Sequence, residues 1–298
     1  MIKPRYPVYV ISKSRWKECH TANFMADDDV DFHLVVEPQE AQKYRNRYGS
    51  ERVIETPFSN LGLGGIPVRN FVWEHSVTEG HARHWIFDDN IRSIRRWNKG
   101  WRIPCDSNPA LACVEDFTER YENIAISGLQ YVANAVDAET QPPYYLNCHV
   151  YSALLIRNDI PYRWRGRYNE DTDLCLQVLS GGWCTVCVNA FLIQKIASMK
   201  MKGGNTDELY KGDGRLKMAR SLERMWPLVV TTDRRYKRPQ HVVHKNWKLF
   251  GTPLKRREDI DWDNMQPNEY GLKLMAETEV KSTALRKLLD ESNDNART

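Results

Sequence analysis

The sequence predicts an α/β protein whose mainly parallel sheet is flanked by helices. Through the first half of the chain, short runs rich in valine, isoleucine and aromatic residues alternate with helical segments. Each run is bounded by polar residues or proline, which is typical of buried strands. Strands separated by helices form βαβ units, and such sheets bind ligands at the carboxyl ends of their strands.

The elements of the first half can be assigned in order. Strands are predicted at 6–12, 32–37, 52–56 and 84–88. Helices are predicted at 40–48 and 64–79. Pro67 suits the first turn of the second helix, where apolar residues then repeat at helical spacing.

The second half changes character. Strands are predicted at 124–128, 147–156 and 183–188, and helices at 169–180 and 213–226. Beyond Leu228 the chain is basic and is predicted to be irregular, with a polar tail that frays. We therefore expect one domain over 1–230 and a basic extension over 231–298 that packs on it.

Composition excludes several classes of protein. The chain has 298 residues, of which 41% are hydrophobic and 28% charged, so a disordered, collagen-like or coiled-coil protein is not indicated. No apolar run reaches the length of a membrane span, and the N-terminus does not resemble a secretory signal. Seven cysteines, an odd number, do not form a disulfide framework. Reduced thiols in a cytoplasm are expected.

The sharpest motif is a hydrophobic strand that runs directly into Asp88, Asp89 and Asn90. Carboxylates at the rim of a sheet are suitable ligands for a divalent cation that carries a diphosphate. Because side chains alternate along a strand, Asp88 and Asn90 share one side unless the strand ends there. A plain turn with a helix cap would also explain these residues.

A second acidic cluster, which contains Glu170, Asp171 and Asp173, opens the helix predicted at 169–180. A carboxylate there could deprotonate a hydroxyl nucleophile, and the helix N-terminus would keep it ionised. Ordinary complementation of the helix dipole remains an alternative for any one of these acids. Two acidic motifs at the ends of elements nevertheless favour a catalytic site.

Two glycine-containing segments are candidate phosphate-binding loops. The segment 60–70 lacks the lysine of a P-loop and the spacing of a dinucleotide fold, so a sharp turn explains it equally well. Lys200 and Lys202 precede a Gly-Gly pair and would suit a leaving diphosphate, or simply a solvated loop. Cys184 and Cys187 point to opposite faces of the strand predicted at 183–188, so we interpret them as structural thiols.

Basic residues interleaved with aromatic ones indicate binding to nucleic acid. The net charge is only +4, yet the segment 234–257 contains nine lysines and arginines and no acidic residue. A smaller basic patch follows the first acidic motif. Solubilising charge is the alternative. The residues that we expect to contact DNA are Arg92, Arg95, Arg96, Trp97, Trp101, Arg234, Arg235, Lys237, Arg238, Lys245, Trp247 and Lys248.

Six motifs in this order resemble a single family: YPVYVISKSR at 6–15, VVEP at 35–38, LGLGGIPVRN at 61–70, WIFDDNI at 85–91, YNEDTDLCLQVL at 168–179 and GGN at 203–205. The set resembles the phage TET-associated glycosyltransferases, a GT-A-type family found beside TET/JBP-type oxygenases and linked to glycosylation of hydroxymethylated DNA bases. The resemblance implies a GT-A nucleotide-diphosphate-sugar transferase fold.

The resemblance also implies roles for individual residues. Asp88, Asp89 and Asn90 would hold Mn²⁺ or Mg²⁺ and, at Asp88, the nucleotide, although Asn90 departs from the usual acid at the third position. Glu170 or Asp171 would face the acceptor hydroxyl, with Asp171 as the base of an inverting reaction. The remaining residues expected to bind the nucleotide sugar are Ser12, Arg15, Glu37, Arg69, Asn70, Lys200 and Lys202.

The resulting hypothesis is a metal-assisted transfer of a hexose or pentose from a nucleotide sugar to a hydroxymethylated pyrimidine of phage DNA. 5-Hydroxymethylcytosine is the favoured acceptor, made by a TET/JBP-type enzyme in the host cytoplasm. Within duplex DNA the base would be flipped out, and Trp97 or Trp101 could fill the gap. The alternatives are a two-metal nuclease, a catalytically silent DNA-binding protein, and a glycosyltransferase that acts on a protein or glycan.

Overall fold

The computed structural model describes residues 2–138, 140–196, 201, 214–235, 238–243 and 247–264. Contacts divide the chain into two compact units, Met1–Lys255 and Arg256–Thr298. In the second unit, Arg257 pairs with Asp259, and the guanidinium of Arg256 lies 4.5 Å from the centre of the Trp262 ring. The boundary predicted at residue 230 stays a prediction. Lys200, Lys202, Lys237 and Lys245 lie outside the described residues.

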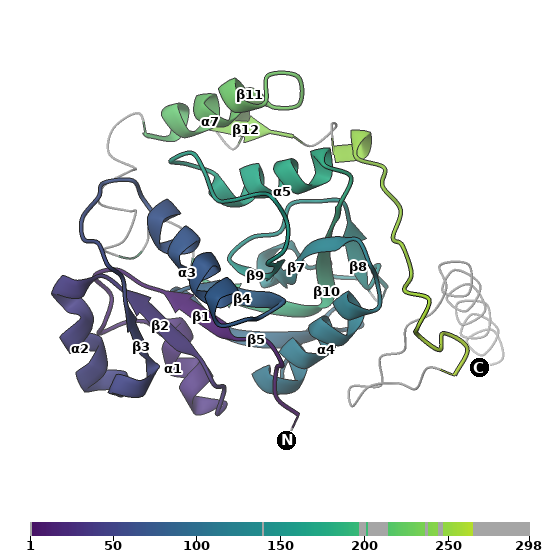
Figure 1. Ribbon diagram of the computed structural model, residues 1–298. Coiled ribbons are helices and arrows are strands. Elements are labelled where there is room, and N and C mark those ends of the chain that lie inside the picture. The colour runs from purple at the N-terminus through teal and green to yellow at the C-terminus, as the bar shows by residue number, and fades with distance from the viewer. Residues whose placement is uncertain are drawn as a thin grey trace. The chain divides into compact units, whose positions relative to one another are not determined.

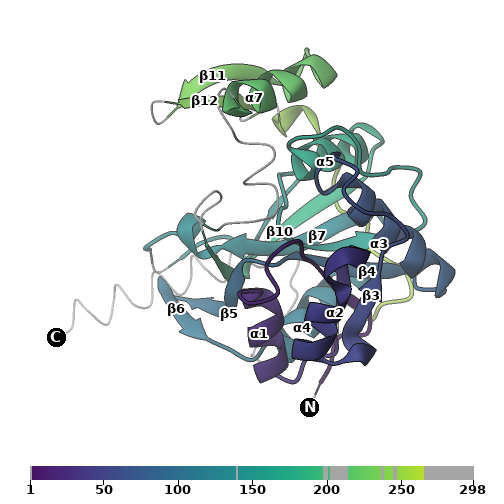
Figure 2. The same cartoon turned by 90° about the vertical axis from the view of Figure 1, so that its left-hand side faces the viewer.

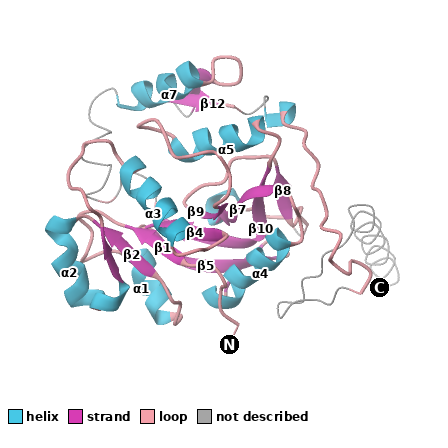
Figure 3. Cartoon of the chain, in the orientation of Figure 1, coloured by secondary structure: helices cyan, strands magenta, loops and turns pink. Residues whose placement is uncertain are grey.

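The first unit is built on a ten-stranded mixed sheet in the order β3-β2-β1-β4-β9-β7-β10-β5-β6, with β8 paired to β10 (Figures 1 and 3). The strands are β1 (Val8–Ile11), β2 (His33–Val36), β3 (Val53–Glu55), β4 (Arg83–Asp88), β5 (Ile91–Asn98), β6 (Trp101–Pro104), β7 (Ile124–Tyr131), β8 (Tyr144–Leu146), β9 (Ala153–Arg157) and β10 (Cys184–Lys195). A two-stranded sheet, β11 (Thr231–Arg235) and β12 (Arg238–Val242), follows.

The predicted mixed α/β class is confirmed. The first four strands in the order β3-β2-β1-β4 are parallel, as is the pair β7 and β10. Antiparallel β9 lies between β4 and β7, and the hairpin of β5 and β6 continues antiparallel from β10. The carboxyl ends of β1, β2, β4, β7 and β10 therefore meet at one edge of the sheet.

Helices cover both faces of the sheet. Helices α3 and α5 lie on one face, and α1 and α4 lie on the other (Figure 2). The helices are α1 (His20–Asp27), α2 (Pro38–Tyr48), α3 (Ile66–Thr78), α4 (Ser107–Glu119), α5 (Glu170–Ser180) and α7 (Gly214–Met225), with short 3₁₀ turns η1 (Ser50–Arg52), η2 (Val132–Asn134) and η3 (Trp247–Leu249).

The core beneath α3 and α5 is apolar and closely packed, and Trp73 of α3 is fully buried in it. Leu176 on the outer side of α5 joins a second cluster with Leu222 of α7, Val230 and Val243. Burial of these aliphatic side chains attaches α7 and the β11–β12 hairpin to the main body of the first unit. Among the described residues no helix is long and apolar enough to cross a membrane.

Several sequence-based assignments need correction. The strand predicted at 147–156 is confirmed only from Ala153 onward, because Asn147 and Ser152 adopt positive φ angles of 53° and 67° that interrupt extended backbone. The strand predicted at 183–188 continues to Lys195. The region after Leu228 is not irregular throughout, since β11 and β12 pair there. Helices α1 and α4 and the strands β5, β6 and β8 were not predicted.

Candidate active site

A pocket of about 340 Å³ lies where the carboxyl ends of the parallel strands meet. Such an edge is where open α/β sheets bind their ligands. The pocket brings together segments from the whole first unit, including both predicted acidic motifs. Its polar and glycine lining residues are Ser12, Lys13, Arg15, Glu37, Gly62, Gly64, Gly65, Arg69, Asp88, Asp89, Asn90, Tyr131, His149, Ser152, Asn169, Glu170, Asp171, Thr172, Lys195 and His241.

The first acidic motif reaches the pocket because β4 ends at Asp88. With the strand ended there, Asp88, Asp89 and Asn90 all line the same pocket instead of alternating between two faces. The side-chain nitrogen Nδ2 of Asn90 donates to the carbonyl oxygen of Ile196 at 3.2 Å. The side-chain oxygen Oδ1 of Asn90 is buried and has no partner among the described residues.

Asp88 is held by two cations. Its Oδ1 accepts a hydrogen bond from Arg69 Nη2 at 2.8 Å, and its Oδ2 accepts one from Lys195 Nζ at 2.7 Å. Burial acts to raise the pKa of Asp88, but the charges of Lys195 and Arg69 outweigh it and hold that pKa well below its ordinary range. Asp88 is therefore ionised at neutral pH.

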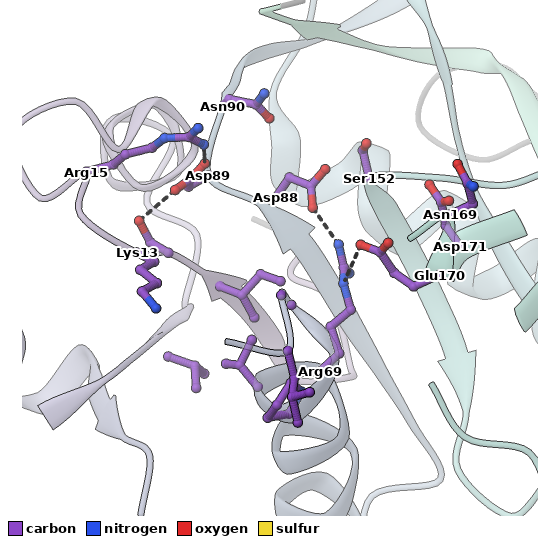
Figure 4. Close-up of a pocket in the computed structure, with 18 of the residues that line it drawn as sticks. Lys13, Arg15, Arg69, Asp88, Asp89, Asn90, Ser152, Asn169, Glu170 and Asp171 are labelled. Carbon is purple, nitrogen blue, oxygen red and sulfur yellow. Dashed lines mark hydrogen bonds and ion pairs between the residues drawn. The ribbon is translucent and has the colours of Figure 1, made fainter. Parts of the chain in front are cut away.

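Asp89 turns to the opposite side (Figure 4), and both of its oxygens are also engaged. Oδ1 accepts a hydrogen bond from Arg15 Nη1 at 2.5 Å, and Oδ2 accepts one from Ser12 Oγ at 2.8 Å. Ser12 Oγ also lies 2.7 Å from the hydroxyl of Tyr44 on α2. Burial raises the pKa of Asp89 above its ordinary value, although Arg15 acts in the opposite direction. This network ties the ends of β1 and β4 together.

The second acidic motif begins α5. The left-handed backbone of Asn169, with a φ angle of 55°, lets the chain turn into the helix, and its side chain donates to the carbonyl oxygen of Met218 at 2.8 Å. Arg69 bridges the two motifs, since its Nε lies 3.5 Å from Glu170 Oε1 while Nη2 donates to Asp88 (Figure 4). Burial raises the pKa of Glu170, with Arg69 opposing and neighbouring Asp171 adding to the effect.

Asp171 faces a histidine. His149 Nε2 lies 3.5 Å from Asp171 Oδ1 and 3.1 Å from Thr172 Oγ1. Burial acts to raise the pKa of Asp171, but His149 and Arg69 act in the opposite direction and the pKa is lowered. Two carboxylates that are adjacent in sequence thus have pKa values shifted in opposite directions, an arrangement common in acid–base sites.

The opposite end of the pocket lies at β2 and at the glycine loop, the part of the segment 60–70 that precedes α3. Gly62 and Gly64 have positive φ angles of 67° and 65°, a backbone conformation that glycine adopts without strain. Glu37, after β2, accepts a hydrogen bond from the backbone nitrogen of Asn60 and pairs with Lys13 at 3.3 Å. These contacts hold the loop against β2.

The residues present do not fit a divalent ion held by the first acidic motif. All four carboxylate oxygens of Asp88 and Asp89 already accept hydrogen bonds, and Asn90 Oδ1 is the motif's one side-chain oxygen without a partner among the described residues. In the same part of the chain, no group of three or more His, Cys, Asp or Glu side chains is arranged to hold a metal. The predicted metal ligands stay a prediction.

Most of the predicted site residues converge on the pocket. Ser12, Arg15, Glu37, Arg69, the first acidic motif and, from the second, Glu170 and Asp171 line it. Asp173 does not line it and pairs with Arg165 instead. Asn70 does not, because its side chain clamps the backbone of Trp164 through two hydrogen bonds of 2.9 and 3.0 Å.

The predicted DNA contacts fall into two groups. Arg92, Arg95, Arg96, Trp97 and Trp101 lie on the β5–β6 hairpin, where Arg92 and Trp101 are exposed, the latter at 74%. Arg234 and Arg238 are exposed on the second hairpin, to which Arg235 also belongs. Lys248 lies in η3. Trp247 is partly buried and stacks on His149, with ring centres 6.4 Å apart, so it lies directly behind the pocket.

Sequence reasoning missed Lys195, Ser152, Tyr131 and His149, and it gave His241 no specific role. Lys195 ends β10, where the register shifts at a bulge next to it. A cation at the end of a long apolar strand is a signal that could have been found, but the strand was predicted only as far as residue 188. The histidines carried no such signal, because burial and neighbours decide their role; burial, for example, lowers the pKa of His241 to about 4.

A comparison with known families bears on this geometry. The model of one family, described as TET-Associated Glycosyltransferase, matches residues 6–204. This range includes the glycine loop and both acidic motifs. The mixed α/β architecture is consistent with a GT-A-like fold. None of the curated proteins compared with the chain matches it.

Proposed function

Since the chain belongs to the TET-associated glycosyltransferase family, we propose that it transfers a sugar from a nucleotide sugar to the hydroxyl of a hydroxymethylated pyrimidine in phage DNA, with 5-hydroxymethylcytosine as the favoured acceptor. Transferase activity and a nucleotide-sugar donor follow from the family itself. One observation carries the proposal: the four carboxylates of Asp88, Asp89, Glu170 and Asp171, together with Glu37 and the cations Arg15, Arg69 and Lys195, converge in one pocket at the carboxyl edge of the sheet.

The pocket suggests how the donor binds. Ser12, Glu37 and the glycine loop would accept the nucleoside, and the cations near Asp88 would face the diphosphate. The sugar would then lie between Asp88 and the second acidic motif. Holding both reactants in this orientation makes the transfer effectively unimolecular.

In an inverting reaction, the acceptor oxygen forms a bond to the anomeric carbon while the bond from that carbon to the diphosphate oxygen breaks. The electron pair leaves with the diphosphate, and the proton of the hydroxyl passes to a carboxylate. We assign that carboxylate to Asp171, with His149 as its neighbour. Glu170 lies against Arg69 and is the second candidate.

Basic residues support a DNA acceptor. Exposed Arg92, Arg234 and Arg238 would neutralise phosphates, and exposed Trp101 would stack on a base or fill the gap that a flipped base leaves. A functional link to a TET/JBP-type oxygenase would supply the hydroxymethyl group. Neither the nuclease nor the silent binding protein is favoured by a described contact.

Mass spectrometry of digested DNA tests the proposal. The protein is incubated with a panel of nucleotide sugars and DNA that contains 5-hydroxymethylcytosine, with Mn²⁺, with Mg²⁺ or with EDTA, because metal dependence stays a prediction. We expect one nucleoside to gain the mass of a hexose or pentose, and Asp171→Asn to abolish the gain. The same DNA without hydroxymethyl groups is the control. If proteins or glycans incubated in the same way gained the mass of a sugar and DNA did not, the proposal of a DNA acceptor would be wrong.

A further inference from the structure

The departing diphosphate needs positive charge near Asp88, and in GT-A-type chemistry a metal held by the acidic motif would supply it. Here Asp88 Oδ2 accepts a hydrogen bond from Lys195 Nζ. Asp88 Oδ1 accepts one from Arg69. Two side-chain cations therefore already contact the carboxylate that such a metal would need.

Lys195 is built into this position. Its ammonium also lies 2.6 Å from Ser152 Oγ and 5.7 Å from the centre of the Tyr131 ring. Ser152 itself has a φ angle of 67°, a strained conformation for a residue with a side chain and a frequent feature of functional sites. The Lys195 side chain is only 13% exposed, so its ammonium is held at this place by these contacts.

Arg69 supplies the group that awaits an anion. Its side chain is 7% exposed; Nε lies 3.5 Å from Glu170 Oε1, and Nη1 has no hydrogen-bond partner among the described residues. A buried guanidinium donor without a partner is costly unless a ligand satisfies it. Because Arg69 lines the pocket and is fixed through Nη2 to Asp88, a phosphate oxygen is the group that matches the unpartnered Nη1.

We propose that Lys195 and Arg69 together stabilise the departing diphosphate of the donor in place of a divalent ion, with Asp88 as the residue that positions both cations. Arg69 contacts a phosphate oxygen, and Lys195 supplies a second charge-assisted contact to the diphosphate. The proposal rests on the proposed function, since it concerns the leaving group of the same reaction. In this proposal Asp89 does not help to stabilise the diphosphate, because its two oxygens accept hydrogen bonds from Arg15 and Ser12.

Calorimetric titration of nucleoside diphosphates tests this without requiring turnover. Uridine, guanosine, adenosine, cytidine and thymidine diphosphates are titrated into the full chain in EDTA and again with Mn²⁺. We expect one of them to bind with a dissociation constant that changes by less than about threefold between the two conditions. Lys195→Met should weaken binding in EDTA by about 10- to 100-fold, the effect of losing a charge-assisted contact. Lys195→Arg, which keeps the charge, should restore part of the affinity.

Lys43 lies on the exposed side of α2, so Lys43→Met is the matched control. This variant should bind the nucleoside diphosphate with the affinity of the unchanged protein. Binding only with Mn²⁺ would overturn the inference, as would unchanged affinity in Lys195→Met. Titration of the unchanged protein in EDTA shows whether the diphosphate binds without a metal, and this result does not depend on whether a variant folds. Metal-independent diphosphate binding without sugar transfer would defeat the proposed function alone. Transfer that strictly requires Mn²⁺ would defeat this inference alone.

Discussion

His149 Nε2 lies 3.5 Å from Asp171 Oδ1, although the two residues belong to different segments, one irregular and one helical. The same histidine lies 3.1 Å from Thr172 Oγ1 and stacks on Trp247. These neighbours fix the imidazole beside the carboxylate. The pairing distinguishes Asp171 from Glu170, which lies 3.5 Å from Arg69, and several predictions depend on that difference.

Replacing the proposed base should abolish turnover but not donor binding. Asp171→Asn is expected to lower kcat by about 100- to 10,000-fold, the usual contribution of general base catalysis. Nucleoside diphosphate affinity, measured by calorimetry, should stay within about twofold. Glu170→Gln is the matched comparison, and a larger loss of kcat in that variant than in Asp171→Asn would reassign the base to Glu170.

The pH dependence of turnover should follow from His149. Burial acts to raise the pKa of Asp171, but His149, the larger of the opposing causes, and Arg69 lower it, so the base is ionised and kcat/KM should not fall between about pH 7 and about pH 5. In His149→Gln the lowering contribution is lost and burial then moves the pKa of Asp171 upward. The acid limb should therefore move to higher pH in this variant. If the acid limb of the kcat/KM pH profile is the same in both proteins, His149 does not influence the pKa of Asp171.

Asp88 should contribute to stability in a defined pH range. Its pKa is depressed in the folded state, so its contribution is fully present above the ordinary value of 3.8 and is lost as the pH falls from there toward the folded pKa. Asp88→Asn removes the counter-ion that Lys195 and Arg69 share, which should lower the free energy of unfolding at pH 7 by about 2 kcal/mol.

Urea denaturation of both proteins at pH 7 and at decreasing pH values measures this effect. The difference in the free energy of unfolding between the unchanged protein and Asp88→Asn should shrink below about pH 4. Asp116→Asn, which loses an exposed pair with Arg5, is the control and should cost less than about 1 kcal/mol. A difference that stays constant with pH would contradict the assigned pairing.

The β5–β6 hairpin should contact DNA through an exposed aromatic ring. Trp101 is 74% exposed, so Trp101→Ala should leave the free energy of unfolding nearly unchanged. Affinity for hydroxymethylated DNA should fall by about 10-fold or more if the ring stacks on a base. Fluorescence anisotropy with labelled DNA at two salt concentrations measures this. Arg92→Ala should instead reduce the slope of affinity against salt. Unchanged DNA affinity in both variants would remove this hairpin from the acceptor surface.

The sequence by itself determined the parts that depend on local patterns. Short, mainly apolar runs between helical segments predicted β1, β2, β3, β4 and β7 close to their observed bounds, because strands buried on both faces are mainly apolar. Helical spacing predicted α3 and α5, with Pro67 in the first turn of α3. A charge-rich segment predicted α2, and a helical segment that ends before Pro227 predicted α7. The acidic motifs were located at the ends of elements, and the order of six motifs identified the family, which the match over residues 6–204 confirms.

Only the tertiary structure decided which charges meet. Lys195 and Asp88 are separated by 107 residues, and their contact depends on where β10 ends relative to β4, on a bulge and on the left-handed backbone of Ser152. Likewise, Asn70 and Arg69 are adjacent and both polar, yet one clamps Trp164 and the other enters the pocket, because neighbouring side chains of α3 point in different directions. Electrostatic pairing is a property of three-dimensional distance and burial, neither of which a local sequence pattern encodes.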